Sequence, residues 1–120
     1  MTALIAEDEP DIRLVARLSL KRAGFDVVVT ENGAAALAKA ADTMPDVILL
    51  DWMMPELDGP ATCERLKADP STAKIPVIFL TAKSQESEIK RGLALGALGY
   101  ITKPFDAVGL GVRVRELMGV

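Results

Sequence analysis

The sequence predicts an α/β fold in which five helices cover a doubly wound sheet of five parallel strands. Short apolar runs alternate five times with segments of helical periodicity along the 120 residues. Two of these runs, Val47–Leu50 and Ile75–Leu80, are apolar at nearly every position. Continuous rather than alternating hydrophobicity is typical of strands that are covered on both faces, as in parallel sheets. The length of 120 residues and the absence of an internal linker predict a single domain spanning residues 1–120.

Local signals place the individual elements. Pro10 is favoured at the first position of a helix, and Gly24 fits the end of the same helix. Ile12, Val15 and Leu18 are spaced to face the sheet from that helix. The expected strands are Thr2–Ala6, Val27–Val29, Val47–Leu50, Ile75–Leu80 and Gly99–Thr102. The expected helices run from Pro10 to the cap at Gly24, from Gly33 to before Pro45, and over Gly59–Ala68, Glu86–Leu95 and Ala107–Met118.

Composition excludes several classes of function. A net charge of −3 does not provide the basic surface of a nucleic-acid-binding protein. The absence of histidine removes the commonest general base and transition-metal ligand. The single cysteine, Cys63, is expected to be a buried small hydrophobe in a reducing compartment. Because neither a membrane span nor a signal peptide is evident, we expect a cytoplasmic protein without direct nucleic-acid or membrane partners.

Polar side chains stand where four of the predicted strands end. Glu7 and Asp8 follow the first strand, Asp51 the third, Thr81 the fourth and Lys103 the fifth. Doubly wound sheets bind ligands at the carboxyl ends of their strands, so we expect these side chains to converge. Carboxylates without histidine or thiolate partners favour Mg²⁺ or Mn²⁺, and several together need a cation to stay ionised. With a hydroxyl and an ammonium group nearby, the cluster predicts phosphoryl transfer to a carboxylate.

Each of these residues also has a purely structural interpretation. Asp8 could cap the helix that begins near Pro10, and Lys103 could be a surface lysine that covers apolar groups with its stem. Tyr100, near the end of the last strand, could be an ordinary half-buried aromatic residue. Asp51 is the hardest to explain in this way, because a lone carboxylate at the end of a buried strand costs stability unless it has a partner.

The order of these residues resembles the receiver domain of bacterial two-component response regulators, in particular the single-domain chemotaxis regulators. The matching motifs span essentially the whole chain and are Glu7-Asp8, Asp51-Trp52-Met53-Met54-Pro55 with Asp58-Gly59, Thr81-Ala82 and Lys103-Pro104-Phe105. The resemblance implies a flavodoxin-like sheet with the strand order 2-1-3-4-5. It also implies a domain that is not an enzyme in the usual sense, since it would catalyse only its own phosphorylation and dephosphorylation.

The resemblance implies a phosphoacceptor and a set of metal ligands. Asp51 would accept a phosphoryl group from a sensor histidine kinase or a phosphotransfer protein. Asp8, Asp51 and the backbone carbonyl of Met53 would bind Mg²⁺, or Mn²⁺ in its place. Glu7 would act on the metal through a water molecule.

The resemblance also implies a switch. Thr81 and Lys103 would contact the phosphoryl oxygens, and the bond between Lys103 and Pro104 would be cis. Tyr100 would turn inward when Thr81 moves toward the phosphoryl group. A downstream protein would then bind the face formed by the fourth helix, the fifth strand and the last helix.

Two departures from the family pattern concern assembly and lifetime. The transcription-factor branch of the family forms a salt-bridged dimer through acidic residues where this chain has Leu98, Gly99 and Gly109. We therefore expect a monomer or a weak dimer. The residues that would flank the water attacking the phosphoryl group are Met53 and Lys83. Neither side chain is suited to orient a water molecule, so we expect slow self-hydrolysis.

Two alternative functions compete with the phosphoacceptor hypothesis. A degenerate receiver that acts only as a binding module would lack one of the aspartates or the lysine, and none of them is missing. A phosphatase of the haloacid dehalogenase type would need a second aspartate two residues after the first, where this chain has Met53. The end of the sequence at Val120 fits both a stand-alone regulator and a receiver taken from a longer protein.

Overall fold

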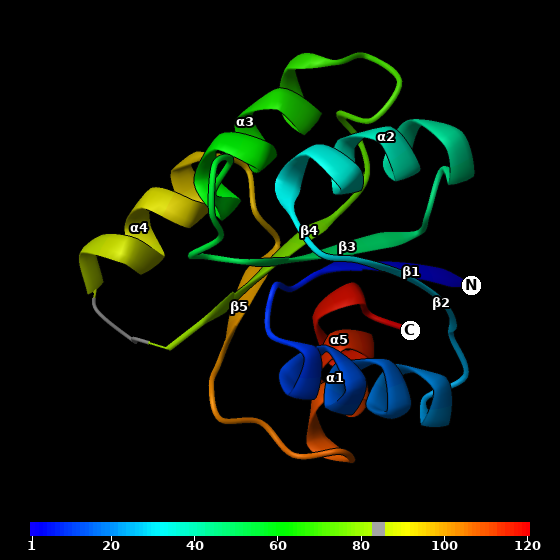
Figure 1. Ribbon diagram of the computed structural model, residues 1–120. Helices are drawn as coiled ribbons and strands as arrows, with labels where there is room; N and C mark the ends of the chain where they lie inside the picture. Colours follow the sequence, from blue (N-terminus) through cyan, green and yellow to red (C-terminus); the bar gives the residue numbers. More distant parts are fainter. Residues whose placement is uncertain (83–85) are drawn as a thin grey trace.

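The computed structural model describes residues 1–82 and 86–120, which form a five-stranded sheet with helices on both faces (Figure 1). The strands are β1 (Thr2–Ala6), β2 (Asp26–Thr30), β3 (Val47–Asp51), β4 (Val77–Thr81) and β5 (Gly99–Thr102). The helices are α1 (Pro10–Arg22), α2 (Gly33–Thr43), α3 (Gly59–Ala68), α4 (Glu86–Ala94) and α5 (Gly109–Met118). All strand pairs are parallel and the order is β2-β1-β3-β4-β5. The predicted fold and strand order are confirmed.

The sheet separates two hydrophobic cores. Helices α1 and α5 cover one face of the sheet, and α2, α3 and α4 lie on the other (Figure 1). Strands β3 and β4 are buried at every position. Leu49 and Leu50 are neighbours in β3, yet Leu49 packs in the core beneath α1 and α5, and Leu50 in the core beneath α2 and α3. This two-sided burial is the physical origin of the continuous apolar runs in the sequence.

Some strand and helix boundaries differ from those predicted. Strand β4 begins at Val77 rather than Ile75, because Pro76 has no N–H group to donate to a neighbouring strand. Strand β2 is longer than predicted and covers Asp26–Thr30, because it pairs with the whole length of β1. Helix α4 ends at Ala94, one residue earlier than predicted.

Helix α5 begins at Gly109, two residues later than the predicted start at Ala107. The carboxylate of Asp106 accepts hydrogen bonds from the backbone N–H groups of Val108 and Gly109 at this point. The first N–H groups of a helix have no partner within the helix, so the Asp106 side chain satisfies donors that would otherwise be free. These hydrogen bonds lower the pKa of the Asp106 carboxyl group.

Helices α1 and α5 approach each other closely at Gly111. Its N–H donates a 2.8 Å hydrogen bond to the hydroxyl oxygen of Ser19. A Cβ atom at this position would lie 2.4 Å from the Ser19 carbonyl oxygen, so only glycine fits. The buried side chains of α1 are Ala16, Ser19 and Leu20. The prediction that Leu18 faces inward was wrong, since small side chains occupy the contact with α5 and Leu18 is 46% exposed.

Two further predictions are confirmed. Gly24 follows α1 with a φ of +97°, a left-handed conformation that glycine adopts without strain. Cys63 is a buried free thiol in the core beneath α2 and α3. Among the described helices, none has both the length and the apolar character that a membrane crossing would need.

Candidate functional site

The parallel sheet brings the polar residues of the four strand ends to one edge. Glu7 directly follows β1, Asp51 is the last residue of β3 and Thr81 the last of β4. Lys103 directly follows β5, and its backbone N–H donates a 2.7 Å hydrogen bond to the carbonyl of Thr81. The site is therefore assembled by topology, because each residue is fixed to a strand that is buried in the sheet.

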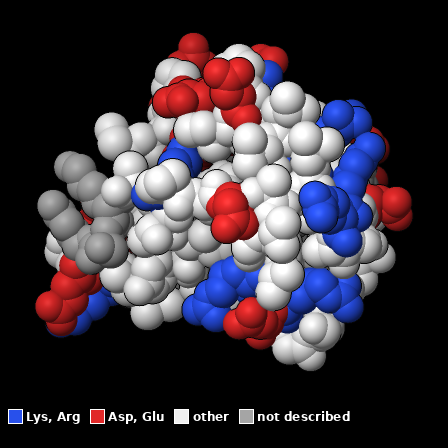
Figure 2. Space-filling model, turned by 90° about the horizontal axis from the view of Figure 1, so that it is seen from below, with Lys and Arg blue, Asp and Glu red and all other residues white. Residues whose placement is uncertain are grey.

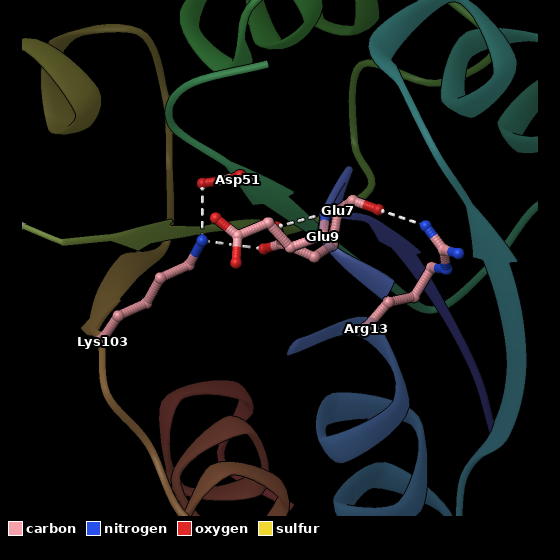
Figure 3. Close-up of polar contacts among 5 residues, drawn as sticks. All are labelled: Glu7, Glu9, Arg13, Asp51 and Lys103. Carbon is pink, nitrogen blue, oxygen red and sulfur yellow. Dashed lines mark hydrogen bonds and ion pairs between the residues drawn. The ribbon is translucent and has the colours of Figure 1, made fainter. Parts of the chain in front are cut away.

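Lys103 links two of the acidic side chains directly (Figure 3). Its Nζ lies 3.0 Å from Oδ1 of Asp51, to which it donates a hydrogen bond. The same nitrogen lies 2.9 Å from Oε2 of Glu7. The side chains of Lys103 and Asp51 are 15% and 7% exposed, and that of Glu7 is fully buried. The ammonium group thus partly compensates two carboxylates that are removed from water.

The three acidic residues can bind one cation together. Glu7, Asp8 and Asp51 each place a carboxylate oxygen within 4.8 Å of the others. Oε2 of Glu7 is buried and, although close to Lys103, makes no aligned hydrogen bond within the described part of the chain. Three hard carboxylate oxygens this close to one another fit a divalent ion such as Mg²⁺. The donor set therefore suits the ion that the sequence predicts.

Hydrogen bonds to the loop after β1 fix the orientation of Glu7. Arg13 of α1 donates from Nη1 to the Glu7 carbonyl oxygen at 2.9 Å and lies 3.6 Å from Glu31 (Figure 3 shows the first contact). The backbone N–H of Glu9 donates to Oε1 of Glu7 at 3.2 Å. The N-cap residue of α1 is Glu9, which makes no side-chain capping bond. Asp8 is therefore not the cap of α1, and its carboxylate belongs to the acidic cluster instead.

Burial and charge set the ionisation of the two central groups. Burial raises the pKa of Asp51 to about 7, and the negative charge of Glu7 adds to this effect, while the hydrogen bond from Lys103 opposes it. Burial alone would lower the pKa of Lys103, but its contacts with Glu7 and Asp51 outweigh burial and raise that pKa. A cation beside Asp51 would favour its ionised form, which is the form needed for nucleophilic attack.

The remaining predicted residues have distinct surroundings. Thr81 is buried, with 4% of its surface exposed. Tyr100 is 37% exposed on β5, and the side chain of Met53 is 74% exposed. The bond between Lys103 and Pro104 is cis, as predicted. Lys83 lies outside the described residues, so its part in the prediction of slow hydrolysis remains a prediction. The metal contact of the Met53 carbonyl also stays a prediction.

The loop after β3 requires glycine. Asp58 accepts a 2.8 Å hydrogen bond from the N–H of Ala61 through its side chain and so caps α3. The N–H of Gly59 donates to the carbonyl of Trp52 at 3.0 Å. A Cβ atom on Gly59 would lie 2.4 Å from the Asp51 carbonyl oxygen. The Asp58-Gly59 turn thus allows the backbone at position 59 to pass close to the main chain of Asp51.

A cavity of about 650 Å³ opens over the acidic cluster. Its lining includes four polar residues of the predicted site, Asp8, Asp51, Thr81 and Lys103. Its apolar wall and three acidic residues, Glu9, Asp11 and Glu88 of α4, were not predicted. The apolar wall includes Ile12, Val15, Trp52 and Phe105. Periodicity places Ile12 and Val15 on the inward side of α1, and only the fold shows that this side ends in the cavity. No signal in the sequence indicates that Glu88 reaches the site.

Comparison with known proteins identifies the family. The model of the response regulator receiver domain matches residues 3–115. The chain belongs to the response regulator receiver family. Receivers are signal-transduction modules of two-component systems that interact with histidine kinases and bind Mg²⁺ at an acidic pocket. The acidic cluster of this receiver fits such a site. The haloacid dehalogenase alternative is not favoured.

Curated relatives of this receiver include a transcriptional regulator and a further response regulator. This receiver is 43% identical over 117 residues to the phosphate regulon transcriptional regulatory protein PhoB of Pseudomonas aeruginosa, covering 98% of the chain and 51% of PhoB. It is 43% identical over 115 residues to the response regulator PleD of Caulobacter vibrioides, covering 95% of the chain and 25% of PleD. The chain therefore spans about half or less of the length of these relatives.

Solved structures of full receiver length show the same architecture. A putative response regulator from Chloroflexus aurantiacus superposes with a TM-score of 0.90 at 31% identity, covering 99% of this chain and 98% of the other. The chemotaxis protein CheY4 of Vibrio cholerae gives a TM-score of 0.90 at 29% identity, with 98% of each chain covered. The helices and strands of this receiver are thus arranged as in chemotaxis-type response regulators.

Proposed function

We propose that residues 1–120 act as a phosphoacceptor switch in which Asp51 takes a phosphoryl group from the phosphohistidine of a histidine kinase or phosphotransfer protein. One observation carries the proposal. The carboxylate of Asp51 ends a fully buried strand, contacts Lys103 at 3.0 Å and lies within 4.8 Å of two further carboxylates. A nearly buried aspartate with this set of neighbours is costly for folding and useful for binding a metal and a phosphoryl group.

Asp8, Asp51 and the carbonyl of Met53 would hold Mg²⁺, or Mn²⁺ in its place, and Glu7 would act on the ion through a water molecule. When bound, the ion supplies positive charge that the transferring phosphoryl oxygens require. The chain's own contribution is a preformed cluster, because Glu7 is fully buried and its carbonyl is held by Arg13. Such pre-organisation reduces the cost of collecting three negative charges at the moment of binding.

The transfer step exchanges one bond to phosphorus for another. A carboxylate oxygen of Asp51 forms the new O–P bond while the N–P bond of the donor breaks, and its electron pair stays on the imidazole nitrogen. Lys103 Nζ is within hydrogen-bonding distance of Asp51, so its ammonium group can stabilise the negative charge that develops there. Thr81, buried at the end of the neighbouring strand, supplies the hydroxyl for a phosphoryl oxygen. In hydrolysis, the oxygen of a water molecule would form a new bond to phosphorus while the O–P bond to Asp51 breaks, which releases inorganic phosphate and restores the carboxylate.

The switch would act through β5. Thr81 of β4 and Thr102 of β5 are opposite each other in the sheet, and Tyr100 lies two residues earlier in β5. Tyr100 is partly exposed and lines a small cavity between α4 and β5. Movement of Thr81 toward the phosphoryl group would let the Tyr100 ring enter this cavity. The face formed by α4, β5 and α5 would then bind the downstream protein, and the receiver would remain a monomer or a weak dimer.

The surroundings of the cavity support a protein as the phosphoryl donor. Helix α1 lines this cavity with apolar side chains and also carries Leu14 and Leu18, each of which is about half exposed. Val112 of α5 is exposed to the same extent. Figure 2 views the molecule from the side of α1 and α5 and shows a largely uncharged area, with an acidic group near its centre and both basic and acidic groups along its border. An exposed apolar area with a charged border is typical of a protein-interaction site.

The experiment is intact-mass measurement after incubation with acetyl phosphate and Mg²⁺. We expect the mass of one phosphoryl group to be added to the wild-type protein, and we expect no addition to Asp51→Asn or in the presence of EDTA. Asp42→Asn, which changes an exposed carboxylate of α2, is the matched control and should be phosphorylated like the wild type. Failure of the wild-type protein to gain mass while Mg²⁺ binds would instead favour a receiver that acts only as a binding module.

A further inference from the structure

Two side chains form the wall between the phosphoacceptor cavity and the small cavity beneath Tyr100. Trp52 and Glu88 line both cavities. Trp52 directly follows Asp51 in the chain, and Glu88 is the third residue of α4. The small cavity is otherwise lined mainly by residues of α4 and β5. The wall therefore connects the site of phosphorylation with the helix whose position defines the proposed output face.

Glu88 carries an uncompensated carboxylate oxygen. Its Oε2 atom is buried and has no hydrogen-bond partner among the described residues. Glu86, two residues earlier in the same helix, differs in both respects because it is exposed and pairs with Lys90 at 3.3 Å. A buried acceptor without a partner raises the energy of the folded state. Any further negative charge in the same cavity would raise the energy of Glu88 again.

Phosphorylation of Asp51 adds negative charge to that cavity. A carboxylate with a charge of −1 is replaced by an acyl phosphate with a charge of about −2. Lys103, which also lines this cavity, already contacts both Glu7 and Asp51. A phosphoryl group placed near a carboxylate disrupts the local structure by like-charge repulsion. The repulsion between the phosphoryl group and the Glu88 carboxylate decreases if the first turn of α4 moves away from Asp51.

Helix α4 is weakly attached and can respond. Within α4, all of whose residues are described, Gly92 alone is buried. At Gly92 the helix lies against two aromatic rings, since a Cβ atom there would be 3.1 Å from Phe79 of β4 and 3.5 Å from Trp52. Arg91 adds a cation–π contact with Trp52 at 6.0 Å. Elements that bury few side chains open at low energetic cost.

We propose that Glu88 is the charge sensor that couples phosphorylation of Asp51 to displacement of α4, by repulsion between the phosphoryl group and a carboxylate oxygen buried in the wall shared with Trp52. This proposal rests on the proposed phosphoacceptor function and adds a positioning residue on α4. Displacement of Glu88 removes part of the wall and so opens the small cavity to the Tyr100 ring. The displacement of α4 and the movement of the Tyr100 ring are therefore coupled through the wall formed by Trp52 and Glu88.

The test compares Glu88→Gln, which removes the charge at equal size, with Glu88→Asp, which keeps it, and with Glu86→Gln as a matched control in the same turn. Each protein is phosphorylated with acetyl phosphate and Mg²⁺, and the phosphorylated fraction is measured by intact mass. Amide hydrogen exchange of α4 and the fluorescence of Trp52, the single tryptophan, are then recorded for equal phosphorylated fractions. Thermal unfolding of the unmodified proteins shows that each variant folds.

We expect phosphorylation to raise amide exchange in α4 severalfold in the wild type, Glu88→Asp and Glu86→Gln, and by half as much or less in Glu88→Gln. Glu88→Gln should also react with the acetyl phosphate dianion about twofold faster, because one repelling charge is gone. A full α4 response in Glu88→Gln would overturn the proposal while leaving the phosphoacceptor function intact. Absence of any mass gain in the wild type would overturn both.

Discussion

Asp51→Asn should make the metal-free protein more stable at neutral pH. Asp51 is 5% exposed, and burial raises its pKa to about 7. In the unfolded chain the same group ionises near its ordinary pKa of about 3.9. Between these two values the folded protein holds a proton that the unfolded chain has lost. The stability contributed by the protonated form is therefore complete below the unfolded pKa and is lost as the pH rises through the folded pKa.

The magnitude follows from the linkage between protonation and folding. A rise of about three in the pKa of Asp51 lowers the free energy of unfolding by an amount on the order of 4 kcal/mol between about pH 4 and pH 7. With an m-value of about 2 kcal/mol/M in urea, the unfolding midpoint of the wild type should fall by about 2 M over this range. Asparagine cannot ionise and keeps the shape of the side chain, so this loss should disappear from the Asp51→Asn variant.

The assay is urea unfolding in EDTA at a series of values from about pH 4.5 to 7.5, the window in which the Asp51 contribution changes. Asp42→Asn removes an exposed carboxylate from α2 and should retain the pH dependence of the wild type. Mg²⁺ should restore stability to the wild type at neutral pH, because it binds the ionised carboxylate of the folded state. Parallel pH profiles of Asp51→Asn and the wild type would refute the argument that burial destabilises the ionised Asp51.

Three further predictions concern other positions. Gly111→Ala should lower the free energy of unfolding by about 1–3 kcal/mol, because its Cβ would lie 2.4 Å from the Ser19 carbonyl oxygen. Gly109→Ala should lower it less, because the atoms nearest to that Cβ belong to the side chain of Asp106. Chemical denaturation measures both values. Glu56→Gly should raise the unfolding free energy by about 1 kcal/mol in the same assay, since Glu56 has a φ of +67°. Met53→Asn should shorten the phosphoryl half-life severalfold, as followed by loss of the phosphorylated mass, because Met53 is 74% exposed at the site and offers no polar group to a water.

The fold could be predicted because the sequence states its burial pattern directly. The unbroken apolar runs of β3 and β4 indicate strands covered on both faces, and that property requires a parallel sheet between two helical layers. Convergence of the strand-end residues then follows from topology, which explains why Glu7, Asp51 and Lys103 could be placed together before their distances were known. The apolar runs do not determine the strand order, which is implied only by the resemblance to receivers.

Features that depend on close packing could not be predicted in the same way. Gly111 reads in the sequence as a residue that weakens a helix, and only the contact with Ser19 shows why a larger residue does not fit. The burial of Ala16 in place of Leu18 has the same origin. Glu88 appears in the sequence as one acidic residue among several in the first turn of a helix. Its position in the cavity wall depends on the orientation of α4, which no local pattern encodes.

Chemical location of the phosphoryl group tests the central claim most directly. The protein is incubated with acetyl phosphate and Mg²⁺, reduced with borohydride to convert an aspartyl phosphate to homoserine, and sequenced by peptide mass spectrometry. Homoserine at position 51, absent without Mg²⁺ and absent from unphosphorylated protein, is the predicted result. Conversion at position 8 instead of position 51, or phosphorylation that remains on the protein without any conversion of Asp51, would contradict the assignment of Asp51 as the phosphoacceptor.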